Sequence, residues 1–154
     1  MAAGPLTSRA TWRVTIIASA FYPTLSRALI QGAAEVLRRA GIPLARIQIL
    51  WVPGAFELPV LAARALRQRP RPDAVITLGA LIRGETPQYE VIAQAVARSL
   101  AQLSVDTGVP VAFGLIVATS LSQAKARAGG THSNRGAEAA RAALETLRIL
   151  ETLR

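Results

Sequence analysis

Residues 79–90 read GALIRGETPQYE, and they contain the side chains best placed to take part in chemistry. Gly79 and Gly84 permit a close approach of the backbone to a ligand. Thr86 is expected to cap a helix, with Pro87 at the first helical position. The free N–H groups at such a helix start attract anions, and phosphate is the usual occupant. The glycine spacing matches neither a Walker loop nor a dinucleotide-binding fingerprint. An ordinary strand-to-helix turn is therefore the alternative interpretation.

Gln88 follows this turn and limits what the site could do. An amide side chain orients water or substrate by hydrogen bonding, but it does not exchange protons at neutral pH. A second anion-binding candidate lies in residues 125–136, KARAGGTHSNRG, where Arg127 ends one helix and Arg135 begins the next. A cation at a helix start is locally unfavourable by a few tenths of a kcal/mol, and a bound anion would reverse that sign. The alternative is a solvated arginine.

Two further segments carry single candidates. In WVPGAFELP, Glu57 could accept hydrogen bonds from a polyol, although a carboxylate at a helix start needs no such role. Phe21 follows an apolar run, where a flat ring could stack on a planar ligand or simply join the core. His132 lies between Thr131 and Ser133 and is interpreted as a loop residue rather than a base.

The elements that must position these residues alternate between short apolar runs and amphipathic stretches. The runs predict strands at 14–19, 46–52, 74–81 and 109–117, and the stretches predict helices at 24–40, 55–66 and 86–103, a short helix opened by Ser120 or Ser122, and a last helix capped by Asn134. This alternation predicts an α/β fold with a four-stranded parallel sheet and helices on both faces. Ligands of such sheets bind beyond the carboxyl ends of the strands.

Composition narrows the class of protein. The 154 residues are expected to form one domain, 1–154, with residues 1–12 as an N-terminal arm. There is no cysteine, hence no disulfide or thiolate metal site, and no apolar run approaches the roughly 18 residues that span a bilayer. Residues 1–11 contain no apolar core of a secretory signal, so a cytoplasmic location is expected.

The chain is strongly basic, with a formal charge of +9 from 18 basic and 9 acidic side chains. Seventeen of the basic residues are arginine, and most of them are dispersed along the sequence. The one tight cluster, Arg67, Arg69 and Arg71, alternates with glutamine and proline in an expected surface loop. Dispersed charge argues against a dedicated nucleic-acid site, and phosphate-bearing small substrates explain it equally well.

Several of these segments together resemble the lumazine synthase family, and the resemblance extends from about residue 14 to residue 149. The matching motifs are WVPGAFELP at 51–59, ITLGALIRGETP at 76–87, VPVAFG at 109–114, QAKARAG at 123–129 and NRGAEAA at 134–140. The resemblance implies a three-layer, flavodoxin-like α/β/α fold that forms pentamers, some of which build 60-subunit shells. It also implies condensation of a ribitylaminouracil with dihydroxybutanone phosphate in riboflavin biosynthesis, with release of phosphate and water and with no metal or organic cofactor.

The resemblance also implies roles for individual residues. Phe21 would stack on the pyrimidine, and Ala55, Phe56 and Glu57 would hold the ribityl chain. Ala80, Leu81 and Ile82 would line the pyrimidine pocket, and Glu85 and Thr86 would meet the phosphate with Arg127 as its charge partner. Phe113 would reach in from a neighbouring subunit, and Arg135 stands where the family usually has lysine. Riboflavin synthase is a candidate protein partner.

Two positions depart from the family pattern. Gln88 occupies the place of the histidine to which proton transfer is assigned, and Tyr22 stands where asparagine is common. These departures predict a slow lumazine synthase. The alternative is a non-catalytic relative that binds flavin or lumazine, or that serves only as a shell-forming scaffold. Thr86 and Arg127 favour the enzyme, because a pure binder has no use for a leaving-phosphate site. A basic scaffold that recruits nucleic acid is a third interpretation, and it rests on charge alone.

Overall fold

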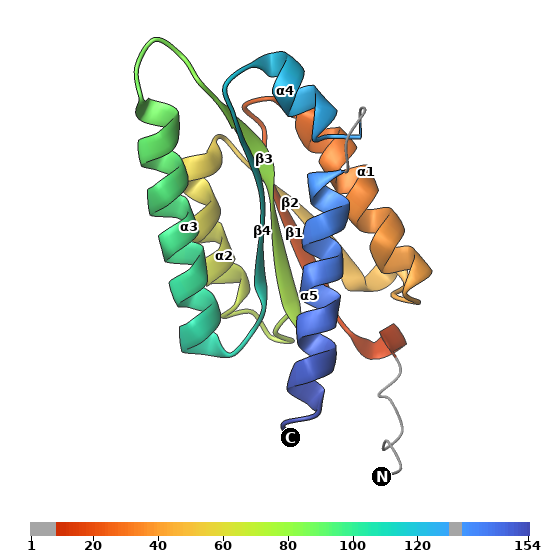
Figure 1. The fold of residues 1–154 in the computed structure, drawn as a ribbon. Helices are drawn as coiled ribbons and strands as arrows, with labels where there is room; N and C mark the ends of the chain where they lie inside the picture. Colours follow the sequence, from red (N-terminus) through yellow and green to blue (C-terminus); the bar gives the residue numbers. More distant parts are fainter. Residues whose placement is uncertain (1–8, 130–133) are drawn as a thin grey trace.

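The computed structural model describes residues 9–129 and 134–154, which form one parallel sheet between two layers of helices (Figure 1). The strands are β1 (Val14–Ser19), β2 (Ile47–Val52), β3 (Ala74–Ile82) and β4 (Val111–Ala118). Their order across the sheet is β2-β1-β3-β4, and every pairing is parallel. The predicted three-layer α/β/α fold is therefore confirmed. His132 lies outside the described residues.

The two faces of the sheet are covered by different helices (Figure 1). Helices α1 (Pro23–Arg39) and α5 (Arg135–Glu151) pack on one face, and α2 (Leu58–Ala65) and α3 (Gln88–Thr107) pack on the other. The short α4 (Leu121–Ala126) lies near the carboxyl end of the sheet. Every residue of β1 is buried, which is the pattern of a strand covered on both faces. No helix of the described part of the chain is long and apolar enough to cross a membrane.

Close packing of α1 against α5 fixes the position of the start of α5. Gly136 lies so near Leu29 that a Cβ there would collide with the Leu29 carbonyl group, so only glycine fits. Asn134 caps α5 as predicted, because its Oδ1 accepts a 3.0 Å hydrogen bond from the Ala137 amide. Its Nδ2 also donates to the Ala28 carbonyl over 3.1 Å, which ties the start of α5 to α1.

The start of α3 differs from the prediction. Thr86 is not the N-cap, since its side chain forms no capping hydrogen bond and the helix begins at Gln88 after Pro87. The Pro87 carbonyl accepts hydrogen bonds from the amides of Glu90 and Val91, at 3.1 and 3.3 Å, so the first turn starts one residue later than expected. The helix also continues to Thr107, where Gly108 with a φ of 68° ends it.

Proline explains two other differences. The helix predicted from residue 55 to 66 is a 3-10 turn, Ala55–Glu57, followed by α2. Pro59 has no N–H to donate to the Ala55 carbonyl, so an α-helix cannot begin at Ala55. Strand β4 begins at Val111 rather than at residue 109, because Pro110 cannot donate to the ladder and offers only its carbonyl, to the Val75 amide at 2.9 Å.

Candidate functional site

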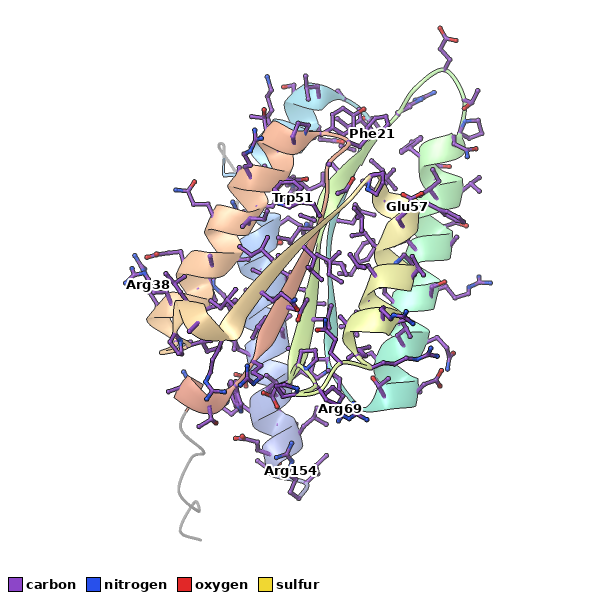
Figure 2. All side chains as sticks on the ribbon, turned by 180° about the vertical axis from the view of Figure 1, so that it is seen from behind. Phe21, Arg38, Trp51, Glu57, Arg69 and Arg154 are labelled. Atoms are coloured by element: carbon purple, nitrogen blue, oxygen red, sulfur yellow. The ribbon has the colours of Figure 1, made fainter. Side chains whose placement is uncertain are left out.

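A cavity of about 550 Å³ lies at the carboxyl ends of β1, β2 and β3. That volume falls within the usual range for small-molecule sites. Figure 2 shows Phe21 and Glu57 at this end of the sheet. The walls are formed by Phe21, Tyr22, Pro53, Gly54, Ala55, Phe56, Glu57, Ala80, Leu81, Ile82, Gly84, Thr86, Gln88, Tyr89 and Ile92.

This carboxyl-end cavity brings together nine of the thirteen residues that the sequence singled out: Phe21, Ala55, Phe56, Glu57, Ala80, Leu81, Ile82, Thr86 and Gln88. The other four, Glu85, Phe113, Arg127 and Arg135, do not line it. Gly79 does not line the cavity either, and a Cβ there would stand 2.9 Å from the Ser19 Cβ, so β1 and β3 leave no room for a side chain at this position. Gly84 has no such restriction, since an added Cβ would meet open space.

Phe21 combines a fixed backbone with an exposed ring. The Ala20 amide donates to the Val52 carbonyl at 2.7 Å, and the Phe21 amide donates to Ser19 Oγ at 3.3 Å. The ring is nevertheless 69% exposed and touches Tyr22 edge-on, with ring centroids 5.0 Å apart. An exposed ring on a fixed loop can stack on a planar ligand without first leaving a core.

Glu57 is the only carboxylate that lines the carboxyl-end cavity. It ends the 3-10 turn rather than lying in the first turn of a helix, and its side chain folds back beside Gly54, where a Cβ would be 3.1 Å from Glu57 Oε2. Within residues 9–129 and 134–154, no group donates a hydrogen bond to it or pairs with it. Its oxygens can therefore accept hydrogen bonds from ligand hydroxyl groups.

Helix α3 contributes two side chains that the sequence analysis missed, Tyr89 and Ile92, beside Gln88. The signal was present, because residues 88 and 92 are one helical turn apart and share a face. The Tyr89 hydroxyl donates a 3.2 Å hydrogen bond to Glu90 Oε1. Partial loss of solvent raises the pKa of Tyr89, the bond to Glu90 raises it further, and Arg83 opposes this. The phenol is therefore neutral at pH 7; its O–H is donated to Glu90, and its oxygen can still accept a hydrogen bond.

Among the residues that the structure describes, none with a cationic side chain lines the carboxyl-end cavity. Arg127 and Arg135 do come together, since the Arg135 amide donates to the Arg127 carbonyl at 2.8 Å, but they do so at the α4–α5 junction. There the Arg135 guanidinium stands 3.3 Å from the Glu138 carboxylate. The sequence suggested that a bound anion balances the charge of Arg135, but Glu138 of the same chain already balances it in part. Glu85 is exposed in the loop before α3.

Phe113 is also separate from the carboxyl-end cavity. It lies on β4, one of the two edge strands of the sheet, and it is 39% exposed. A residue in that position can contact another molecule, and it does not line the cavity of its own chain. Among the described residues there is also no group of three or more His, Cys, Asp or Glu side chains that could hold a metal ion.

Comparison with known proteins gives a consistent result. A model of the 6,7-dimethyl-8-ribityllumazine synthase family matches residues 11–151. A protein of that name from Gemmatimonas aurantiaca is 45% identical over 90% of this chain and 84% of the relative. Relatives of the same name from Thermus thermophilus and Leuconostoc mesenteroides are 43% and 39% identical over 92% of this chain and 89% and 90% of their own lengths.

Proposed function

The chain belongs to the 6,7-dimethyl-8-ribityllumazine synthase family, and we propose that it is the transferase of riboflavin biosynthesis that this name describes. It condenses 5-amino-6-(D-ribitylamino)uracil with 3,4-dihydroxy-2-butanone 4-phosphate and releases phosphate and water. The observation that carries the proposal is the gathering of nine predicted residues, from the segments that follow β1 and β2, from the end of β3 and from the start of α3, around one cavity of about 550 Å³.

The walls of the carboxyl-end cavity suggest how the uracil is held. The exposed ring of Phe21 stacks on the pyrimidine, and Ala80, Leu81 and Ile82 form the opposite wall of its pocket. The unpaired carboxylate of Glu57 accepts hydrogen bonds from the ribityl hydroxyl groups. No group in the described part of the chain donates a hydrogen bond to this carboxylate. Binding of the ligand to Glu57 therefore breaks no hydrogen bond within the protein.

Gln88 makes this a slow enzyme. Addition of the amine to the ketone, elimination of phosphate and ring closure each require proton movement, which an amide does not supply. A positioned acid or base contributes about 10²–10⁴-fold, whereas confinement of two reactants contributes effective molarities of about 10⁵–10⁸ M. The larger contribution, confinement of the two reactants, remains, because Gln88 still lines the cavity and can orient a water molecule or the substrate.

A second copy of the chain completes the site. The phosphate of the four-carbon substrate needs a cation, and within residues 9–129 and 134–154 no cationic side chain lines the carboxyl-end cavity. Arg127 and Phe113 are exposed and lie outside the cavity of their own chain, so we assign them to the cavity of an adjacent copy. Such an arrangement requires an oligomer, a pentamer or a 60-subunit shell, and riboflavin synthase, which consumes the product, is its proposed protein partner.

The direct test supplies purified protein with both substrates and follows formation of the lumazine against the uncatalysed rate. Turnover above that background supports the proposal. Binding of 6,7-dimethyl-8-ribityllumazine without turnover would instead identify a non-catalytic binder that retains the pocket. If the protein shows no turnover and no binding, only the scaffold interpretation is left, and the proposed function is wrong.

A further inference from the structure

A second cavity, of about 410 Å³, lies at the opposite end of the sheet. Arg13, Arg46 and Arg69 all line it, together with Thr15, Gln48 and Gln68. Figure 2 shows Arg69 at this end of the molecule, far from Phe21 and Glu57. The arginines come from three separate segments: before β1, at the end of the 3-10 turn Leu44–Arg46 that leads into β2, and in the connection between α2 and β3.

Hydrogen bonds to the backbone hold this amino-end cavity in shape. Arg46 Nη1 donates to the Thr11 carbonyl at 3.0 Å, and Arg69 Nη1 donates to the Gln68 carbonyl at 3.0 Å. Each bond uses one of the five N–H donors of a guanidinium, so both side chains keep donors for a ligand. Gln48 Oε1 accepts from Thr15 Oγ1 at 3.4 Å, and the amide nitrogen of Gln48 stays free to donate.

The charge around the amino-end cavity is not balanced by the chain. No carboxylate lines it, and among the described residues none of its three arginines forms an ion pair. The acid adjacent to it in sequence and space is Asp73, whose Oδ2 accepts the Arg13 backbone amide at 2.7 Å. Like charges that share one cavity repel one another. A bound anion turns this repulsion into attraction.

We propose that the amino-end cavity binds a small molecule through a phosphate group. The planar guanidinium matches two phosphate oxygens at once, and three arginines with two glutamine amides provide donors from several directions. A small molecule is favoured over a nucleic-acid backbone because the site is a confined cavity. Of the exposed run Arg67, Arg69 and Arg71, only Arg69 lines it, so no continuous basic track leads away. This inference does not depend on the proposed function.

The test is calorimetric titration with inorganic pyrophosphate at constant ionic strength. Replacing Arg69 by glutamine (Arg69→Gln) should weaken binding about 10–100-fold, since charge-assisted hydrogen bonds are lost. Arg46→Gln should have a similar effect. The matched controls Arg67→Gln and Arg71→Gln make the same charge change in the same segment outside the cavity, and should shift the dissociation constant less than about twofold.

Three outcomes would overturn the inference. The first is that pyrophosphate does not bind. The second is that the control substitutions weaken binding as much as Arg69→Gln does, which indicates diffuse electrostatic attraction. The third is that only a single-stranded oligonucleotide binds through these arginines. Arg127→Gln separates this site from the carboxyl-end cavity, because it should reduce lumazine turnover and leave pyrophosphate binding at Arg69 unchanged. Arg69→Gln should do the reverse. A thermal unfolding curve of each variant identifies any variant that fails to fold. If Arg46→Gln does not fold, Arg69→Gln still tests the site.

Discussion

The two cavities at opposite ends of one sheet differ in almost every physical respect. In the part of the chain that the structure describes, the carboxyl-end cavity is lined mainly by apolar side chains and backbone, with one carboxylate and no cation. The amino-end cavity has three arginines and no carboxylate. The first arises where strands run into loops and helix starts, which is where parallel sheets bind ligands in general. The second arises because three arginines precede or connect strands that lie side by side.

This difference means that a single chain can bind an anion at one cavity, whereas the other cavity needs an assembly of several copies. The amino-end cavity has all its charges within one chain, so anion binding there needs no partner. The carboxyl-end cavity can hold the uncharged uracil alone, but its phosphate-bearing substrate needs a cation from elsewhere. Turnover should therefore depend on association between copies, whereas anion binding at the amino end should not. Three predictions test this contrast, in order of decreasing effect.

The largest effect is expected from Gln88→His. An imidazole at this position supplies the missing proton carrier, so kcat should rise by about 10²–10⁴-fold. The pH profile should gain a dependence near the ordinary imidazole pKa of about 6.5. Gln94→His is the matched control, because Gln94 is exposed on the same helix and does not line the cavity. If neither variant changes turnover, the carboxyl-end cavity is a binding pocket rather than a slow active site.

The loops of that cavity could be predicted because their signals are local. Apolar runs located all four strands, and Gly79, Thr86 and Gln88 marked the turn after β3. The errors were local too, since α3 begins one residue later than expected and Pro59 split the helix after β2. Residue types indicated these turns, but only the backbone geometry fixed which residue begins each helix.

The amino-end cavity could not be predicted, because its arginines are far apart in the chain. Arg69 stood out in the sequence only as part of an exposed run, and nothing there related it to Arg13 or Arg46. Their convergence depends on β1 pairing with both β2 and β3, which brings the three amino ends together. Strand order is a long-range property, and a single sequence without related sequences does not specify which charges will meet.

The second prediction concerns the cation supplied to the carboxyl-end cavity. Arg127→Ala should raise KM for dihydroxybutanone phosphate about 10–100-fold, because a charge-assisted hydrogen bond to phosphate is lost. The dissociation constant of the uracil should change little. Arg141→Ala, an exposed arginine on α5, is the control for loss of charge alone.

Mixing two impaired variants determines which copy supplies Arg127. Glu57→Gln weakens ribityl binding and Arg127→Ala weakens phosphate binding, so each homo-oligomer should be slow. After unfolding and refolding together, a mixed oligomer contains cavities with an intact Glu57 beside a neighbour with an intact Arg127. Turnover should then exceed that of either variant alone. If mixing restores nothing, Arg127 acts within its own chain or not at all.

The smallest effect is expected on the outer face of α1, away from both cavities. Glu35 accepts hydrogen bonds from Arg38 Nη2 at 2.9 Å and from Arg39 Nε at 2.7 Å. Both bonds lower the pKa of Glu35, and the hydrogen bonding from Arg38 has the larger effect. A lowered pKa means that the folded state favours the carboxylate. The pair therefore stabilises the fold above the ordinary pKa of 4.5, and this contribution is lost as the pH falls through the lowered value.

Glu35→Gln should accordingly reduce the free energy of unfolding slightly at pH 7, since exposed ion pairs contribute little. In urea titrations the difference from the parent chain should be smaller at a pH below 4.5 than at pH 7, because the carboxylate of the parent is increasingly protonated there. Turnover and pyrophosphate binding should both be unchanged, because the residue lines neither cavity. An equal loss of stability at both pH values would mean that the glutamate contributes through packing of its methylene groups and not through its charge.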